Sequence, residues 1–594
     1  MQNKGNLILA IALSIMIIGL WNYFFPAPQP QIPPDKPAIT DKTAVTDNTD
    51  QSSVKPDQPI ITSREQALAN NPRVIIDSAK LKGSINLRGL RFDDLTLSQY
   101  TTTSDNTTPI TLLSPSNSPN GYVIDLGWLS HNDRLSLPNN KTLWSANKKT
   151  LKAGDDVTLT YRADGLIYRV LINLDDNYLF TIKQSVQNLS RTNQDMAFYG
   201  LLARFGEVPK SIGIVHQGGL IMMDKKLTEK SYKKIPAQPL QLEGKNGWLG
   251  FSDKYWLTAL VPHINDENKP NTTTNTLNNI DKKFVSRMGY DETGASGRGR
   301  YQMDYVMDYE ILPRRQTIEK NIYLFAGPKD TSIINNYVTS KNIEKFDLAI
   351  DYGMLYFITK PMAQLLNFLS QQFNSVGWAI IGLTVIVRLL LYPFAQKSFR
   401  SMGMMRKLAP KVNELKKRYK TSQEQSQAMM ALYKKEGINP LAGCWPMLIQ
   451  IPVFFALFRV FSISIEFRHA PFFGWISDLS APDPLGILTL FGLIEWQVPS
   501  YLSIVNIGIW PIIMGASIWL QQKFNPPVSD PIQAKIFAYF PFVFTFMLGS
   551  SPAGLVIYWS WNNILSIFQQ YIINRQLGNP IYNPFESFKK ARQR

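Results

Sequence analysis

The sequence Ala379-Ile-Ile-Gly-Leu-Thr-Val-Ile-Val-Arg388-Leu-Leu-Leu-Tyr392 is apolar enough to cross a membrane and yet contains an arginine. A guanidinium stays charged in proteins, and placing it in the middle of a span costs on the order of 3 kcal/mol. An ionisable residue in such a position is by default a functional one. The stretch therefore predicts a membrane protein and makes Arg388 its first candidate functional residue.

Apolar runs recur outward from this stretch and divide the chain into two kinds of protein. The overall hydrophobic fraction of 44% averages a polar region, 26–340, with a strongly apolar region beyond residue 350. A membrane span needs roughly 20 apolar residues. Six runs approach this length and predict an α-helical polytopic bundle with spans at 7–25, 376–392, 444–465, 507–522, 537–548 and 554–573.

The first apolar run predicts a transmembrane signal anchor in 1–25. It ends in Trp21-Asn-Tyr-Phe-Phe25, which is typical of an interfacial aromatic belt and unlike the small residues of a cleavage site. Residues 26–62 are rich in Pro, Thr, Asp and Gln, and they predict a flexible linker.

The net charge of +17 is concentrated beside the predicted spans, so it indicates topology more than nucleic-acid binding. Segment 394–441 and the tail 576–594 are basic, whereas the segment between the third and fourth spans is mainly acidic. Because basic loops stay in the cytoplasm, both termini are predicted there and the polar domain outside, across a bacterial inner membrane.

Residues 63–340 predict a large antiparallel β-sandwich. Alternating β-branched and aromatic residues, separated by turn residues, occur at 157–161, 166–174, 178–186, 248–256 and 301–309. The single cysteine, Cys444, lies outside this domain, so the domain must rely on its hydrophobic core.

Helical spacing marks two further segments. Residues 344–372 predict an amphipathic helix on the outer membrane face, with its apolar side at Met354, Leu355, Ile358, Met362, Leu365, Leu366 and Leu369. It precedes the span 373–393. In 394–441, a heptad seam over 405–419 and a capping box at Thr421–Glu424 predict a helical hairpin. Its basic surface is either a solvated cytoplasmic face or a contact for ribosomal RNA or anionic lipid; the residues concerned are Arg406, Lys407, Lys411, Lys416, Lys417 and Arg418.

Three physical explanations compete for Arg388. Its side chain could snorkel to the cytoplasmic interface, because the predicted helix end at Tyr392 is only about 6 Å away. It could pair with an intramembrane acid, but the other spans contain none. It could line a water-filled cavity with Thr384 and Gln450. From the residues alone, the snorkel and the cavity are equally favoured. The sequence also does not show whether Arg388 or Arg459 is the better candidate functional residue. Arg459 could snorkel outward or approach Glu466.

The sequence gives little sign of catalysis. His131, His216, His263 and His469 have no metal-ligand spacing, and no Walker loop, HExxH or GxSxG motif is present. The glycine-rich stretch 289–300 does not lead from a strand into a helix, as a phosphate-binding loop would. We therefore expect no enzyme, no cofactor and no metal site. The spans also lack the repeated halves and midplane ionisable groups that are usual in ion-coupled transporters.

Motifs in the region 344–575 are similar to those of the YidC/Oxa/Alb family of membrane protein insertases. They occur in the family's order: Ile386-Val-Arg-Leu-Leu-Leu-Tyr-Pro393, Met429-Met-Ala-Leu-Tyr-Lys434, Asn439-Pro-Leu-Ala-Gly-Cys-Trp-Pro446, Leu448-Ile-Gln-Ile-Pro452, Phe467-Arg-His-Ala-Pro471, Asp478-Leu-Ser480, Ser529-Asp-Pro-Ile-Gln533 and Pro552-Ala-Gly-Leu-Val-Ile-Tyr558. The anchor and the long outer domain resemble the Gram-negative form, in which that domain is a β-supersandwich similar to sugar mutarotase folds.

This resemblance implies a membrane protein insertase and chaperone that acts alone or with the Sec translocon, possessing a hydrophilic groove open to the cytoplasm and to lipid. Five of the six spans, including those within 442–575, would form the insertase core. The implied partners are nascent membrane proteins, the ribosome and membrane lipids, without sequence-specific nucleic acid. The implied groove residues are Arg388, Thr384, Gln450, Ile451, Phe454, Tyr558 and Trp559. Ile451 and Trp559 replace a methionine and a tyrosine of the family pattern, and the segment 485–503 is longer than that pattern.

Two other functions stay open from the residues. The first is a secondary transporter that binds an anionic solute at Arg388. The second is a carbohydrate enzyme of the envelope that is merely anchored by its spans; activity of an isolated 63–340 domain would distinguish it.

Overall fold

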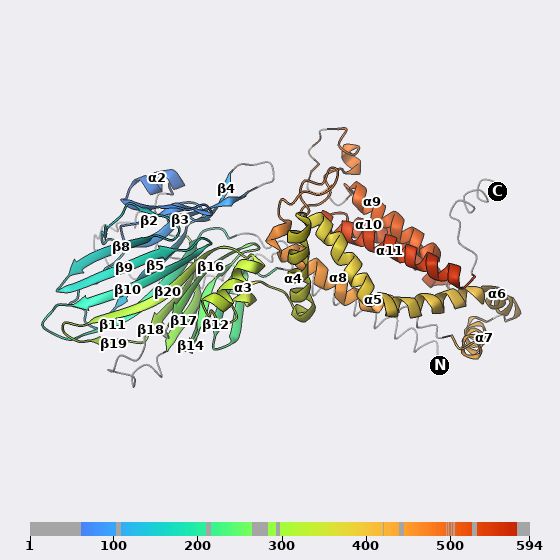
Figure 1. Ribbon diagram of the computed structural model, residues 1–594, viewed down its shortest axis with the longest axis horizontal. Coiled ribbons are helices and arrows are strands. Elements are labelled where there is room, and N and C mark those ends of the chain that lie inside the picture. The colour runs from blue at the N-terminus through green and yellow to red at the C-terminus, as the bar shows by residue number, and fades with distance from the viewer. Residues whose placement is uncertain are drawn as a thin grey trace, which may run out of the picture. The chain divides into compact units, whose positions relative to one another are not determined.

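The computed structural model describes residues 61–578 except 103–107, 209–214, 264–282, 293–297, 420, 439–444, 495, 497, 500–501, 503–504 and 525–530. The predicted anchor, nearly all of the linker and most of the tail lie outside the described residues. The chain divides into two compact units, shown in Figure 1. Within the described residues, the β unit comprises 61–98, Thr111–Asp253 and Thr258–Gly327, and the helical unit comprises Gln99–Ile110, Lys254–Leu257 and 328–578.

Two large sheets build the β unit. The first sheet has the order β14 (Leu240–Gly244), β17 (Phe284–Asp291), β18 (Arg300–Met307), β11 (Gln194–Phe205), β5 (Tyr122–Leu129), β3 (Arg91–Thr101), β2 (Leu81–Asn86), β1 (Arg73–Asp77) and β7 (Thr150–Leu151), with β19 (Glu310–Leu312) paired to β11 and β4 (Pro109–Leu113) to β3. The second has the order β13 (Lys226–Ser231), β12 (Gly218–Met223), β15 (Gly247–Ser252), β16 (Trp256–His263), β20 (Thr317–Pro328), β10 (Leu179–Asn188), β9 (Leu166–Leu174), β8 (Asp156–Ala163) and β6 (Ser145–Ala146). Helix α2 (Arg64–Ala69) precedes β1.

The sheets pack face to face through aromatic side chains. Phe92 of β3 meets Phe180 of β10 edge to face with ring centroids 5.5 Å apart, and Trp128 of β5 meets Tyr168 of β9 at 5.1 Å. All four side chains are fully buried. Because such rings bury large apolar areas, they form a core that needs no disulfide, and the predicted β-sandwich is confirmed.

Two predicted strands are wrong in detail. Residues 248–256 form the end of β15 and the beginning of β16, because the chain turns at Asp253, which is ion-paired with Arg204 at 2.9 Å. Residues 301–309 likewise end as a strand at Met307, and a separate short strand, β19, follows. In both places the strand ends directly before an aspartate, Asp253 or Asp308, a residue type that is depleted in strands.

The helical unit contains α3 (Thr331–Ser340), η2 (Phe346–Ala349), α4 (Tyr356–Phe373), α5 (Val376–Lys407), α6 (Ala409–Arg418), α7 (Ser422–Lys435), α8 (Trp445–Ile463), η4 (Ile465–Phe467), η5 (Ile487–Thr489), α9 (Ile509–Phe524), α10 (Pro531–Leu548) and α11 (Ala553–Gln576). Helix α11 packs against α5, α8 and α9, whereas α10 packs on α9, and α4 packs on α5 and α8. The central position of α11 explains why its polar side chains are buried.

Helix α5 is longer than the predicted span. It continues past Pro393 to Lys407, because proline removes only one backbone donor and the following turns can resume the helix. Within the described residues, α5 is also the one helix both long and apolar enough to cross a membrane, and Leu448–Ile463 and Lys535–Leu548 are shorter apolar helices. The number of six spans therefore stays a prediction.

The predicted amphipathic helix over 344–372 is divided in two. Helix α4 begins only at Tyr356, and η2 precedes it, because Gly353 adopts φ +72° in the connection. Met354, expected on the apolar side, precedes α4 and is exposed. The later positions fit better: Met362, Leu366 and Leu369 are buried.

The segment predicted to be a helical hairpin, 394–441, contains two short helices, α6 and α7. Helix α7 begins where expected, with the Thr421 hydroxyl accepting a hydrogen bond from the Glu424 backbone N–H at 3.3 Å. The heptad seam is interrupted, because α5 ends and α6 begins at Leu408, next to Pro410. Leu408 and Met405 pack against Ile438 and Tyr433, which joins the far end of α7 to the end of α5.

Candidate functional site

Arg388 of α5 is hydrogen-bonded to α11. Its Nε donates to the Asn562 Oδ1 at 2.8 Å, and its Nη2 donates to the Asn562 backbone oxygen at 3.0 Å and to the Ser566 hydroxyl. Its Nη1 has no hydrogen-bond partner among the described residues, and the side chain is partly exposed. The helices α5 and α8–α11 contain no Asp or Glu. The charge is thus fixed in position by neutral groups and is not neutralised.

The two partners of Arg388 belong to a polar row that the sequence reasoning missed. Asn562, Ser566, Gln570 and Asn574 follow one another at intervals of four on α11, and all are buried. Residues four apart lie on the same face of a helix. Searching this apolar helix for polar residues at that interval would have found the row beside Arg388. The Gln570 Oε1 is buried without a partner in the described part of the chain.

A second polar contact joins α8 to α11 one turn before Asn562. The Gln450 Nε2 donates to the Tyr558 hydroxyl at 2.9 Å. Thr384 behaves differently, because its hydroxyl is fully buried and donates to the Ile380 backbone oxygen of its own helix at 2.7 Å. Thr384 therefore lies one turn from Arg388, as expected, but its donor is already used.

The other predicted groove residues form an apolar surface. The Trp559 ring meets the Phe454 ring edge to face, with centroids 4.9 Å apart, and it meets Phe544 of α10 at 5.0 Å. Trp559 also packs on the buried cluster of Met514, Ile518, Leu548 and Val556. Ile451, one turn from Phe454 on α8, is 36% exposed. Polar groups on α5, α8 and α11 are thus bordered by aromatic ones on α8 and α11.

Arg459 has a different environment. It is buried, forms an ion pair with the Asp351 carboxylate, and donates from Nε to the Asp351 backbone oxygen at 2.8 Å. Gly353 leaves room for the guanidinium, because a Cβ there would lie 3.2 Å from its Nε. Arg459 therefore connects α8 to the segment before α4, and it does not pair with Glu466 as the sequence allowed.

Glu466, just beyond α8, is half-buried, and its Oε1 is buried without a hydrogen-bond partner among the described residues. Loss of solvation on burial, followed by the nearby charge of Asp330, raises the pKa of the Glu466 carboxyl to about 7. The segment directly after α8 thus holds a carboxyl whose pKa is raised toward neutral pH.

The basic hairpin exposes part of its predicted charge. Lys407, Lys417 and Arg418 are exposed and form no ion pair with the described residues. Lys411 pairs with Glu436 at 3.0 Å, whereas Arg406 and Lys416 are half-buried. Exposed cations therefore occur at both ends of α6, with Lys407 before it and Lys417 and Arg418 in its last turn.

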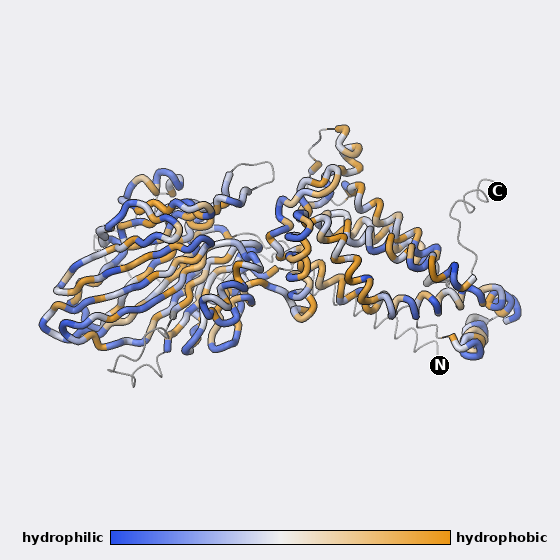
Figure 2. Tube along the Cα trace, viewed as in Figure 1, coloured by the Kyte–Doolittle hydropathy of each residue, from blue (hydrophilic) through white to orange (hydrophobic). Residues whose placement is uncertain are grey.

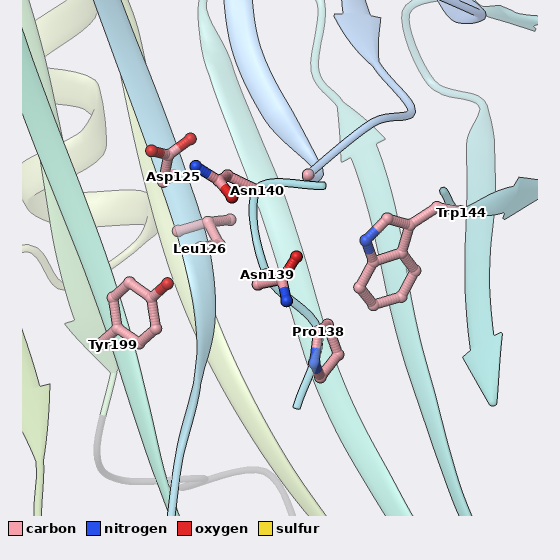
Figure 3. Close-up of a pocket in the computed structure, with 8 residues that line it drawn as sticks. Asp125, Leu126, Pro138, Asn139, Asn140, Trp144 and Tyr199 are labelled. Atoms are coloured by element: carbon pink, nitrogen blue, oxygen red, sulfur yellow. The ribbon is translucent and has the colours of Figure 1, made fainter. Parts of the chain in front are cut away.

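The β unit contains a small polar cavity between its loops and strands (Figure 3). It is lined by Asp125 and Tyr199 from β5 and β11 and by Pro138, Asn139, Asn140 and Trp144. Its volume of about 30 Å³ admits about one water molecule and is far below the hundreds of Å³ of a small-molecule site. Within the described residues, no group of three or more His, Cys, Asp or Glu side chains could hold a metal ion.

The helical unit is largely apolar, contains an arginine without a carboxylate partner, and continues from a β-sandwich. These features indicate a protein embedded in a membrane. The family described as 60Kd inner membrane protein matches residues 368–579, and the YidC periplasmic domain matches residues 73–365. The membrane protein insertase YidC of Rhizobium meliloti (strain 1021) is 41% identical over 604 residues, covering 97% of this chain and 96% of the relative. That of Rickettsia bellii is 40% identical over 580 residues, covering 97% and 99%. The chain belongs to the YidC family of membrane protein insertases.

A crystal structure of an active YidC insertase with its first transmembrane domain resolved is also similar, with 17% identity, coverage of 86% of this chain and 93% of that one, and a TM-score of 0.34. The family assignment rests on the sequence relatives. It confirms the predicted insertase, a non-enzymatic function in the inner membrane, over the anion transporter and the anchored carbohydrate enzyme.

Proposed function

We propose that a nascent membrane protein places its polar outer segment beside Arg388, between α5 and α11, on its way across the membrane. One observation carries this proposal: the guanidinium is held by Asn562 and Ser566, while Nη1 and the positive charge remain available. A fixed charge without a carboxylate partner attracts water and acidic groups. Gln450, Tyr558 and Thr384 would extend this polar path, and Ile451, Phe454 and Trp559 would contact the apolar part of the substrate.

A hydrated path would lower the free-energy cost of moving a polar segment through hydrocarbon. Each unsatisfied backbone group costs several kcal/mol in lipid. A hydrated path supplies hydrogen-bond partners over part of the distance, and partition of the apolar segment into lipid then drives the last step. The chain itself would need no nucleotide.

The path would open to the cytoplasm, where the lysine and arginine bias places the hairpin α6–α7 and both termini. In this topology the β unit is periplasmic. Lys407, Lys417 and Arg418 would contact a ribosome or anionic lipid, because exposed cations attract either surface. Cooperation with the Sec translocon is part of the same proposal, and it follows from the family's properties.

Site-specific photo-crosslinking to stalled nascent membrane proteins tests the path. A photoreactive residue at Ile451 or Phe454 should crosslink the nascent chain. The matched control is Trp378, an apolar residue at the beginning of α5 that is 56% exposed; it should crosslink much less at the same nascent-chain length. Equal crosslinking at all three positions, or crosslinking at Trp378 alone, would contradict a path beside Arg388.

A further inference from the structure

An exposed apolar segment precedes α9 at the end of the helical unit opposite the hairpin. We call residues 485–494 the outer segment. It carries no charged residue, and its large side chains are exposed, to 84% at Leu493; the others are Ile487, Leu490, Phe491 and Ile494. Figure 2 shows the same stretch as hydrophobic, and Figure 1 shows it projecting sideways from the beginning of α9. Exposed apolar clusters of this kind mark a surface that something covers.

The outer segment is an ordered structure. The Phe491 N–H donates to the Gly486 oxygen at 2.9 Å, and the Ile494 N–H donates to the Thr489 oxygen at 3.1 Å. Leu490 and Phe491 adopt φ +46° and +57°, a left-handed conformation that is uncommon for bulky residues. The turn therefore presents its apolar side chains outward in a fixed arrangement.

The base of the outer segment is attached to the first turn of α9. Buried Asp483 accepts hydrogen bonds from the Trp475 Nε1 at 2.9 Å and from the Trp510 N–H at 2.8 Å. The Ile487 N–H donates to the Ile507 oxygen at 3.0 Å, and Gly486 bridges to Gly508. These contacts fix the position of the outer segment relative to the first turn of α9.

The beginning of α9 indicates what covers the outer segment. Ile512 and Ile513, in the first turns of α9, are exposed apolar residues. The outer segment is hydrogen-bonded to Ile507 and bridged to Gly508, directly before these turns. Exposed apolar side chains thus occur both on the outer segment and on the membrane-type helix that it adjoins, and lipid is the apolar surface available to such a helix.

We propose that the outer segment lies in the outer leaflet of the membrane, at the boundary between acyl chains and headgroups, and anchors the adjoining end of α9 there. Exposed Trp496 lies two residues after its end, and tryptophan favours this interface. The occupant of the surface is lipid, because the apolar side chains continue those of a helix in the membrane. The proposal rests on residence in the membrane and is independent of the path beside Arg388.

Spin labels in the full-length protein, in vesicles of phosphatidylethanolamine and phosphatidylglycerol without substrate, test this placement. In a Cys444→Ser background, the label is attached at Leu493→Cys, at Val543→Cys on α10, or at Ile311→Cys in β19. The two controls are exposed apolar positions, at 62% and 70%. At Leu493 and Val543 we expect collisions with oxygen to exceed those with a water-soluble nickel chelate, and at Ile311 the reverse.

Two results would overturn the proposal. A label at Leu493 that behaves like the one at Ile311 would place the outer segment in water. Exclusion of both relaxing agents would place it against protein, such as a second copy of the chain. A second variant tests the cause: Leu490→Asp should shift the Leu493 label toward the nickel chelate and leave Val543 unchanged. An unchanged Leu493 label would show that these apolar side chains do not hold the segment in lipid.

Discussion

Arg388 and Arg459 lie in neighbouring helices of the same unit, yet they have opposite partners. Arg459 is buried against the carboxylate of Asp351, whereas Arg388 donates only to uncharged groups of Asn562 and Ser566. A buried charge is costly unless it is paired. The paired arginine therefore connects α8 to the segment before α4, and the unpaired one keeps a positive charge inside the helical unit.

The largest expected effect comes from removing the unpaired charge. Arg388→Ala should slow insertion of substrates with acidic outer segments about tenfold or more, because two charges about 4 Å apart interact by on the order of 4 kcal/mol at an effective dielectric constant of about 20. Substrates with neutral outer segments should lose less. Reconstituted insertion assays measure both rates.

Arg388→Lys is the control for this prediction, because it retains the charge and changes the hydrogen-bonding geometry. It should keep much of the activity if positive potential is what matters. Equal losses for the alanine and lysine variants, or equal losses for acidic and neutral substrates, would show that the charge is not essential.

Because Arg459 pairs with Asp351, Glu466 has no ion-pair partner among the described residues. We therefore expect the free energy of unfolding to depend on pH. The pKa of Glu466 is raised from 4.5 to about 7, so its contribution to folded stability is complete below pH 4.5 and is lost as the pH rises to about 7. The loss corresponds to about 3 kcal/mol. Glu466→Gln should remove this part of the pH dependence.

Thermal unfolding of the detergent-solubilised protein between pH 4.5 and 8 measures the effect. Glu414→Gln, at an exposed carboxyl of α6, is the matched control and should leave the profile unchanged. A Glu466→Gln profile parallel to that of the wild type would refute the titration of Glu466 in this range.

Removing the ion pair between Arg459 and Asp351 should lower the stability of the protein and leave substrate selection unchanged. Arg459→Ala leaves the Asp351 carboxylate without its partner and should destabilise the protein by about 2 kcal/mol, less than for a fully buried pair because Asp351 is partly exposed. Arg459→Leu combined with Asp351→Asn should recover part of the loss. A selective defect with acidic substrates would instead assign Arg459 to the path.

Asn562→Ala should have the smallest effect, because Arg388 keeps its bonds to the Asn562 backbone and to Ser566. We expect about 1.5 kcal/mol of lost stability and a partial loss of insertion. Asn563, whose Nδ2 donates to the Ser517 hydroxyl at 2.9 Å, is the control. Combined with Arg388→Ala, the Asn562 change should be non-additive and the Asn563 change additive.

The sequence predicted the two-part architecture because alternation and long apolar runs are local signals. Strand β9 matches its predicted limits, and Thr421 caps α7 as expected. Pro393 was misleading, because a proline inside a helix depends on the packing around it. The helix boundary at Tyr356 was missed because the conformation of Gly353 is not visible in an apolar pattern.

Much of the candidate site could be predicted, but the partners of Arg388 were not. Gln450 and Tyr558 do meet, and Phe454 and Trp559 are in contact. Asn562 and Ser566 are distant in sequence from Arg388, and only the packing of α5 on α11 brings them to it. The same limit applies to Arg459, for which the sequence left open snorkelling or an approach to Glu466, whereas the structure provides Asp351.

Chemical rescue at position 388 distinguishes a fixed positive charge from every other property of the arginine side chain. Arg388→Cys in a Cys444→Ser background should be inactive toward acidic substrates and should react with membrane-impermeant thiol reagents from the cytoplasmic side. A cationic reagent should restore insertion, and an anionic reagent of similar size should not, because the path needs a fixed positive charge reached by water from one side. Equal rescue by both reagents, or reaction only from the periplasmic side, would contradict this requirement.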